Sequence, residues 1–291
     1  MSDSQWNVAN LRMCASGEIA TVHQVLHYAL ILLTFGALTG VTTVLFGFGG
    51  GFVTVPVVYA ASTLRPDVVD PMHVAVASSA AVMVVNSLSA TVAFRNSGRL
   101  RTEYIRPLIG PVAVGAGLGA VAAGHVDDAV VRILFVLYLV VTILDSILRQ
   151  GFLTPHVPRD HLGPHGLRTA GIGIGAVASF LGVGGSVMTV PMMRRGGVPM
   201  ADAAASANPL SLPVAVVATA VYAAASGGIT ASDLSAGRVG AVDVLAVCAL
   251  LAGSLPAIAL SRRFVGVIPD RVHACAYIAL LCVVTTVMVI A

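Results

Sequence analysis

Two glycine-rich segments contain the residues of this chain whose types and spacing could bind a ligand. Both lie within apolar sequence, and the second follows the first after 135 positions. The residues concerned are Gly49, Gly50, Gly51 and Thr54 in the first segment and Gly184, Gly185, Ser186 and Thr189 in the second. If a helix begins directly after each glycine run, its first amide groups are unpaired and the positive end of its dipole faces the glycines. Such a helix start binds an anion without a basic side chain.

The glycines themselves have two interpretations. Glycine lets a ligand approach the backbone, but it also lets two helices pack closely in a membrane. Because the run is duplicated and is followed each time by a Thr-Val-Pro sequence, we predict a binding site. The hydroxyl groups of Thr54 and Thr189 could bond either the ligand or the preceding helical turn.

A second layer of polar side chains is expected from the third apolar segment of each half. Asn208 could bond a substrate oxygen or a backbone carbonyl that the helix break exposes, and Ser78 is included in the predicted binding site with it. An asparagine inside a membrane is costly unless it is paired. For Asn86 we favour a bond to the neighbouring backbone, and the other serines of these segments are expected mainly to pack against helices.

Other kinds of chemistry find little support in the sequence. No carboxylate or histidine lies clearly at the centre of an apolar run, which argues against a proton relay, and Asp145 is expected to pair with Arg149 on one helix. No nucleophile or nucleotide-binding motif occurs, and the three histidines of segment 149–168 are expected to be solvated. We therefore predict no cofactor, no metal and no enzymatic activity.

The composition places the chain in a membrane. It has 291 residues, of which 57% are hydrophobic and 10% are charged, whereas soluble proteins carry about 25% charged residues. The net charge of +3 comes from basic residues scattered over short loops, so nucleic acid is not an expected partner. The expected partners are the lipid bilayer and a small anionic substrate, and the sequence leaves open whether the chain forms homo-oligomers.

Apolar runs of about twenty residues, long enough to cross a bilayer, alternate with shorter runs beside the glycines. Each half should be all-α, with a glycine-tipped re-entrant or broken helix followed by three transmembrane helices. We predict an N-terminal polar segment (1–24), a first transmembrane repeat (25–148), a cytoplasmic linker (149–168) and a second transmembrane repeat (169–291).

Further matches between the halves support a duplication. The Pro-Met pair at 71–72 and Ser78 recur 128 positions later, at 199–200 and Ser206. The loop 95–106 has four arginines and one glutamate, so it should be cytoplasmic. If each glycine element is a hairpin, Arg194 and Arg195 also face the cytoplasm, both termini lie outside, and the repeats are inverted. The two tips would then meet near the middle of the membrane from opposite sides.

The duplicated elements at 49–56 and 184–191, with the Pro-Met and serine positions behind them, resemble the TauE/SafE sulfite exporter family, also called toluene-sulfonate uptake permeases. The resemblance covers roughly residues 27–290 and implies a multi-pass protein of the bacterial inner membrane that moves sulfite, organosulfonates or related small anions. An interior-negative potential favours anion exit by about 2.3 kcal/mol per charge per 100 mV, so we expect export. An uncoupled anion channel and a scaffold or accessory subunit without transport are the alternatives.

Overall fold

The fold is described from a computed structural model, which covers residues 29–63, 68, 70–148, 152, 164–224 and 237–290. The predicted segment 1–24 and most of the predicted linker 149–168 lie outside these residues. Within them the protein is almost entirely helical, and seven helices are long and apolar enough to cross a membrane. The prediction of an all-α polytopic membrane protein is therefore confirmed.

The two halves have the same order of helices. In the first half the elements are a helix at Ala29–Phe46, the short α2 (Gly51–Thr63), α3 (Pro71–Phe94), α4 (Thr102–Ala123) and α5 (Asp128–Leu148). In the second half they are α6 (Pro164–Leu181), the short α7 (Ser186–Arg195), α8 (Met200–Ala224), α10 (Val244–Ser261) and α11 (Asp270–Ile290). A small hairpin of β1 (Arg238–Val239) and β2 (Val242–Asp243) precedes α10, and the turn η1 (Arg262–Phe264) follows it.

The helix after each glycine run is too short to cross a bilayer. α2 has 13 residues and α7 has 10, which at the helical rise correspond to about 20 and 15 Å. The hydrocarbon core of a bilayer is about 30 Å thick. Each of these two helices therefore has one end inside the protein, as the sequence predicts for half-helices.

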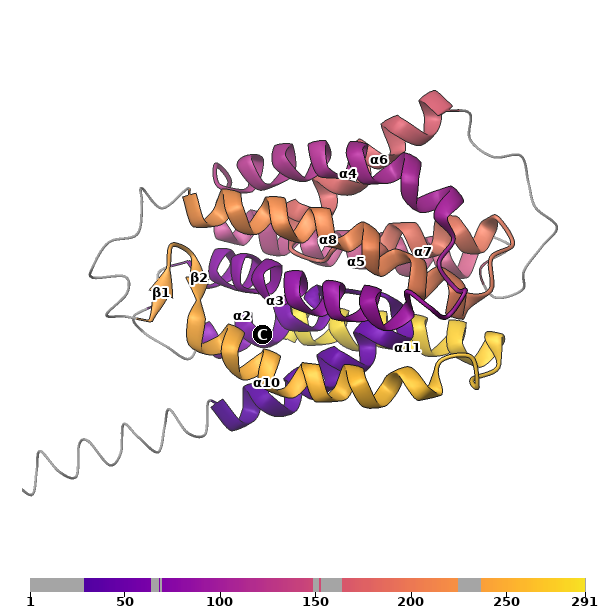
Figure 1. Cartoon of the computed structure of the whole chain (residues 1–291). Helices are drawn as coiled ribbons and strands as arrows, with labels where there is room; N and C mark the ends of the chain where they lie inside the picture. Colours follow the sequence, from indigo (N-terminus) through magenta and orange to yellow (C-terminus); the bar gives the residue numbers. More distant parts are fainter. Residues whose placement is uncertain are drawn as a thin grey trace, which may run out of the picture.

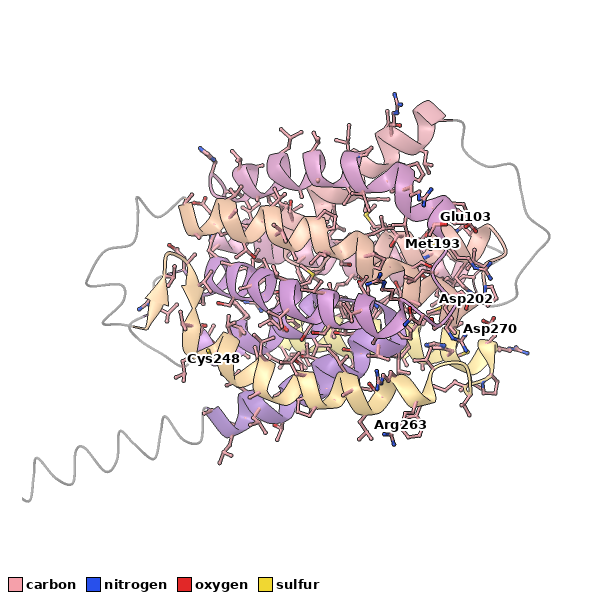
Figure 2. The ribbon with its side chains drawn as sticks, in the orientation of Figure 1. Glu103, Met193, Asp202, Cys248, Arg263 and Asp270 are labelled. Atoms are coloured by element: carbon pink, nitrogen blue, oxygen red, sulfur yellow. The ribbon has the colours of Figure 1, made fainter. Side chains whose placement is uncertain are left out.

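Ion pairs gather at one end of the helix bundle, which lies to the right in Figure 1 and which we call the arginine end. Arg99 and Arg101 both pair with Asp202 at the start of α8, at 3.3 and 2.6 Å. Asp145 of α5 pairs with Arg195 of α7; its expected partner, Arg149, lies outside the described residues. Glu103, Asp202, Arg263 and Asp270 all lie toward this end in Figure 2.

The opposite end of the helix bundle contains Asp128, the first residue of α5, and we call it the Asp128 end. Here Arg132 donates hydrogen bonds to the hydroxyl group of Tyr59 in α2 and to the carbonyl oxygen of Met288 in α11, both at 3.1 Å. α2 therefore ends at the Asp128 end, whereas α7 ends at the arginine end. Opposite directions are what inverted repeats require, and the inversion itself stays a prediction.

In each half, a carboxylate at the start of the last helix bonds a backbone amide at the start of the third helix. Asp128 accepts a hydrogen bond from the amide of Met72 at 3.0 Å, at the start of α3. Asp270 accepts a hydrogen bond from the amide of Met200 at 2.6 Å, at the start of α8. Each carboxylate thus pairs amides that a helix start leaves free, and the two contacts lie at opposite ends of the molecule.

A second pair of contacts links the halves to each other. The amide of Asp243, directly before α10, donates to the hydroxyl oxygen of Ser78 at 2.9 Å. The amide of Arg101, directly before α4, donates to the hydroxyl oxygen of Ser206 at 2.8 Å. Each of these contacts in one half has a counterpart in the other half. Met200 and Ser206 of α8 follow Met72 and Ser78 of α3 by 128 positions. Their partners Asp270 and Asp243 follow the partners Asp128 and Arg101 by 142 positions. These equal offsets support the predicted duplication.

Glycines bring helices of different halves into close contact. A methyl group at Gly36 of the first helix would overlap the carbonyl oxygen of Leu250 in α10. A methyl group at Gly175 of α6 would overlap the carbonyl oxygen of Val112 in α4. Small residues allow such backbone approach in membranes, so the broken helix of each half packs on a long helix of the other half.

Large apolar side chains cover much of the outer surface. Ile133 of α5, Leu118 of α4 and Val289 of α11 are 64%, 61% and 61% exposed. Lipid tails solvate such side chains, whereas soluble proteins rarely expose contiguous apolar patches of more than a few hundred Å². The exposed surface therefore agrees with a multi-pass membrane protein.

Candidate functional site

Each glycine run forms a tight break between two helices. The first tip, residues 47–50, joins the first helix to α2, and the second tip, residues 182–185, joins α6 to α7. Gly50 has a backbone φ of +94° and Gly184 has a φ of +70°. Residues with a side chain rarely adopt such angles, so the glycines let the chain reverse direction at these points.

The two tips meet inside the protein. A methyl group at Gly51 would lie 2.5 Å from the carbonyl oxygen of Gly182, and one at Gly184 would lie 3.4 Å from the carbonyl oxygen of Phe48. The hydroxyl group of Ser79 reaches both segments, with the carbonyl oxygens of Gly182 and Gly51 at 2.6 and 3.3 Å. All residues of both tips are buried. The sequence predicts this meeting, and its position beside the middle of α3 agrees with a site at half the depth of the bundle.

Each tip also packs on the third helix of the other half. A methyl group at Gly47 would overlap the carbonyl oxygen of Ala204 in α8. A methyl group at Gly182 would lie 3.0 Å from the Cα atom of Val76 in α3. The offsets are again 135 for the glycines and 128 for their partners, so α3 and α8 hold the tips in equivalent ways.

The two threonines after the tips differ in their bonds. The hydroxyl group of Thr54 donates to the carbonyl oxygen of Gly50 at 2.9 Å, so it serves the preceding turn of α2. The hydroxyl groups of Thr189 and Ser186 are buried and have no hydrogen-bond partner among the described residues. Only the second tip therefore leaves hydroxyl groups of the predicted set open for a ligand.

Two polar side chains of α3 point at the first tip. The amide nitrogen of Asn86 lies 2.7 Å from the position of a methyl group on Gly50, and the hydroxyl oxygen of Ser87 is the nearest atom to one on Gly49. Both side chains are fully buried, and neither of these atoms has a partner in the described part of the chain. The other amide atom of Asn86, its oxygen, accepts a hydrogen bond from Ser254 at 2.7 Å.

Asn86 and Ser87 lie outside the set of binding residues that the sequence predicts. The expected bond from Asn86 to the neighbouring backbone is not the one that the structure describes, because its oxygen is bonded to a side chain of α10. A signal was present in the spacing. Asn86 and Ser87 follow Ser79 by seven and eight positions, which places all three on one face of a helix.

Two other residues of the predicted set are engaged with backbone groups. The amide nitrogen of Asn208 donates to the carbonyl oxygens of Thr43 and Ala204, both at 3.3 Å, while its oxygen has no partner among the residues described. The hydroxyl oxygen of Ser78 is bonded to the amide of Asp243. Asn208 thus lies beside the first tip, whereas the bond that the structure gives Ser78 joins two helices.

No charged side chain is among the atoms nearest to the tip glycines in the described structure. The polar groups nearest to them are backbone carbonyl oxygens, hydroxyl groups and the side-chain amide of Asn86. Because helix starts carry a positive partial charge, the starts of α2 and α7 beside the tips favour a ligand with negative charge. The side chains described nearest to the tip glycines include no pair of acid and base.

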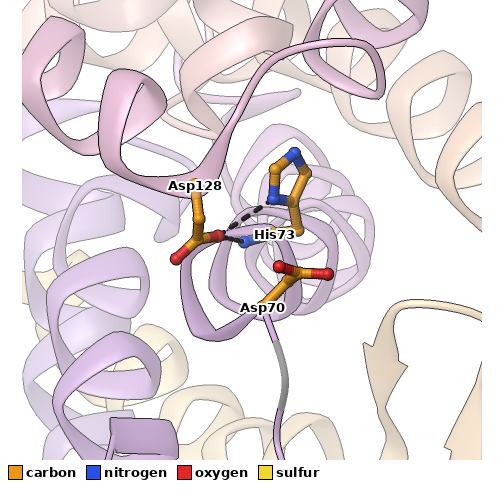
Figure 3. A group of neighbouring side chains, drawn as sticks. All are labelled: Asp70, His73 and Asp128. Carbon is orange, nitrogen blue, oxygen red and sulfur yellow. Dashed lines mark hydrogen bonds and ion pairs between the residues drawn. The ribbon is translucent and has the colours of Figure 1, made fainter.

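A separate polar cluster lies near the Asp128 end (Figure 3). Asp70, His73 and Asp128 each place one possible metal-ligand atom within 4.8 Å of the others. Both ring nitrogens of His73 are already engaged, Nδ1 with Asp128 at 2.9 Å and Nε2 with the carbonyl oxygen of Ala123 at 3.0 Å. Both partners are acceptors, and the ring links the start of α3 to the start of α5 and the end of α4.

Comparisons with known proteins agree with this architecture. The family described as "Sulfite exporter TauE/SafE" matches residues 32–288, nearly the whole chain. A curated relative from Haemophilus influenzae, described as "Probable membrane transporter protein", is 28% identical over 187 residues, which cover 62% of this chain and 67% of the relative. No solved structure matches the chain. Because the family match spans well over half of the chain, the protein belongs to the TauE/SafE sulfite exporter family of membrane transporters.

Proposed function

We propose that this transporter moves a small oxyanion or sulfonate, and that the anion binds where the two glycine tips meet. The observation that carries the proposal is the pair of unpartnered polar groups of α3, the side-chain amide of Asn86 and the hydroxyl group of Ser87. A buried polar group without a partner costs roughly 1–3 kcal/mol. A ligand with several oxygen atoms would remove this cost at both groups together.

The chemistry of the free groups favours an anion over a cation. The oxygen of Asn86 is taken by Ser254, so the amide offers only its N–H groups to a ligand. The carbonyl oxygens of Gly51 and Gly182 face the hydroxyl group of Ser79. Among the unpartnered groups at the tips are the N–H groups of Asn86 and the hydroxyl group of Ser87, which can donate beside two helix starts, and such donors suit sulfite, a sulfonate or a related anion.

The second tip supplies the other part of the proposed site. The hydroxyl groups of Ser186 and Thr189 can donate to the same anion from α7. The first tip has glycine at the position of Ser186 and a threonine already bonded at the position of Thr189. The two sides of the site are therefore chemically different, although the backbone around them is similar.

Electrostatics supports the proposed direction of transport. In a bacterial inner membrane the negative interior favours exit of an anion by about 2.3 kcal/mol per charge per 100 mV. Export thus requires no coupling ion, which agrees with the absence of charged side chains around the described tips. We propose export from the cytoplasm, with movement of one part of the bundle against the other around the tips.

Proteoliposome flux tests the proposal. Purified wild-type protein should move sulfite, thiosulfate and methanesulfonate much faster than acetate, with saturable rates. Ser87→Ala should lower the affinity for the transported anion by about fivefold, because it removes one donor worth about 1 kcal/mol. The matched control is Ser62→Ala, since Ser62 is also a buried serine without a described partner but lies at the far end of α2.

Each other result has a clear meaning. A single-channel current that does not saturate with anion concentration would show that the protein is a channel and not a carrier. Folded protein that moves none of these anions would support a scaffold or accessory role instead. Equal anion affinity in Ser87→Ala and Ser62→Ala would remove Ser87 from the site.

A further inference from the structure

Met83 fills the space between the two tips. Its sulfur atom lies 2.7 Å from the position of a methyl group on Gly184 and 3.1 Å from one on Gly51. Its Cγ atom lies 2.8 Å from one on Gly49. The side chain is fully buried. One thioether thus touches the first tip, the start of α2 and the second tip at once.

Met83 also belongs to the polar face of α3 described above. It follows Ser79 by four positions and precedes Asn86 and Ser87 by three and four, so all four side chains lie on one face of the helix. Ser79 bonds the start of α2 and the second tip, and Asn86 and Ser87 point at the first tip. Met83 is therefore the apolar member of an otherwise polar face, at the point where the tips are closest.

We propose that Met83 occupies the place of the substrate between the buried tips and that its side chain sets the largest anion that can bind. The inference rests on the proposed anion site. An anion held by donors of both tips must lie between them, and the thioether is the group that lies there now. The side chain must move aside before the anion can contact both helix starts.

Methionine suits this task for physical reasons. It is unbranched, with three rotatable bonds, and adapts to irregular spaces better than leucine or valine. Its sulfur is a weak acceptor, so it can face amide donors without the cost of an aliphatic group. When no anion is bound, a side chain of this kind keeps water out of the space between the tips and so prevents leakage.

The first test compares two sulfonates that differ by one methylene group. In proteoliposomes, Met83→Ala should raise the ratio of ethanesulfonate to methanesulfonate flux by about tenfold, the discrimination that one methylene group commonly supports. Met83→Leu, which conserves the volume, should keep the wild-type ratio. Met72→Ala is the control, because Met72 is a fully buried methionine of the same helix away from the tips. An unchanged ratio in Met83→Ala would overturn the proposal.

The second test does not depend on transport. Met83→Cys is introduced after the four native cysteines are replaced by alanine, and its reaction with N-ethylmaleimide is followed. Methanesulfonate at about four times its dissociation constant should slow the reaction by about fivefold, because about one fifth of the protein then remains unoccupied, whereas gluconate should not slow it. Sulfite is avoided because it consumes maleimides. Equal rates with and without methanesulfonate would remove Met83 from the site, whether or not wild-type protein transports anions.

The two tests separate the inference from the proposed function. Wild-type flux with an unchanged Met83→Ala ratio and no protection of Cys at position 83 would leave an anion transporter whose site does not include Met83. Absence of wild-type flux together with protection would leave an anion site at Met83 in a protein that does not transport.

Discussion

The hydroxyl group of Ser79 lies 2.6 Å from the carbonyl oxygen of Gly182, a residue 103 positions later in the chain. This bond joins α3 of the first half to the second tip, and the same hydroxyl oxygen lies 3.3 Å from the carbonyl oxygen of Gly51. One serine therefore ties together the two segments that the proposed transport site requires.

Replacing Ser79 by alanine should destabilise the protein. The substitution leaves a buried carbonyl oxygen without its donor, which costs roughly 1–3 kcal/mol. Thermal unfolding in detergent measures the loss. Ser211→Ala is the matched control, because the hydroxyl group of Ser211 donates only to the carbonyl oxygen of Ala207 on its own helix among the bonds described. If the two variants unfold at the same temperature, Ser79 does not hold the tips together.

The two threonines after the tips should respond differently to valine, which has nearly the same shape. Thr54→Val should leave anion affinity unchanged, because the hydroxyl group of Thr54 bonds its own helical turn. Thr189→Val should lower anion affinity by about fivefold, the effect of one lost hydrogen bond of about 1 kcal/mol. Concentration dependence of sulfite flux measures both. A larger effect at Thr54 than at Thr189 would contradict the assignment.

Alanine should be tolerated at one tip glycine and not at another. Gly50→Ala places a side chain at a φ of +94°, against atoms of Asn86 and Thr39 at 2.7 Å. The left-handed backbone alone costs roughly 1–2 kcal/mol. Gly185→Ala has a φ of −71° and meets its nearest atom at 3.3 Å. The yield of folded monodisperse protein should fall for Gly50→Ala and stay close to wild type for Gly185→Ala.

The carboxylates at the starts of α5 and α11 should both stabilise the protein. Asp128→Ala and Asp270→Ala each remove an acceptor from a helix start, which costs about 1–2 kcal/mol, and Asp270→Ala should cost more because it also removes the ion pair with the buried Arg194. Asp127→Ala is the control, since Asp127 is exposed and adjacent to Asp128. Thermal unfolding of the three variants is the measurement. A cost at Asp128 without one at Asp270 would weaken the equivalence of the halves.

The predicted orientation can be tested with single cysteines. Cysteine at position 99 or 263 should react with an impermeant maleimide only after the cytoplasmic side is opened. Cysteine at position 127 should react from the outside of intact cells. Labelling of position 99 from outside would reverse the orientation and place the termini in the cytoplasm.

The sequence was informative where the signal is local or duplicated. Glycine runs within apolar sequence indicate helix breaks, and their recurrence with Thr-Val-Pro predicts two equivalent tips. Asp128 and Asp270 stand at helix starts, where carboxylates suit free amides. The helices that these carboxylates serve, α3 and α8, are remote in the chain, and pairing of that kind depends on the packed arrangement.

The sequence was less informative about the side chains around the tips. Met83 is an apolar residue in an apolar helix, and its type alone predicts only packing. Asn86 was assigned a backbone partner, but its oxygen bonds Ser254, 168 positions later. Ser78 was included in the predicted site, yet its described bond goes to the amide of Asp243. In each case the identity of a partner from another helix decides the role.

The glycine contacts between halves also have a consequence for biosynthesis. Gly36 fits against α10 and Gly175 fits against α4, so the broken helix of the first half meets its packing surface only after nearly the whole chain has entered the membrane. The first half on its own leaves this surface facing lipid. Maturation is therefore a late joining of two interdigitated halves, and a break in the chain between α5 and α6 should still allow the separately made halves to assemble.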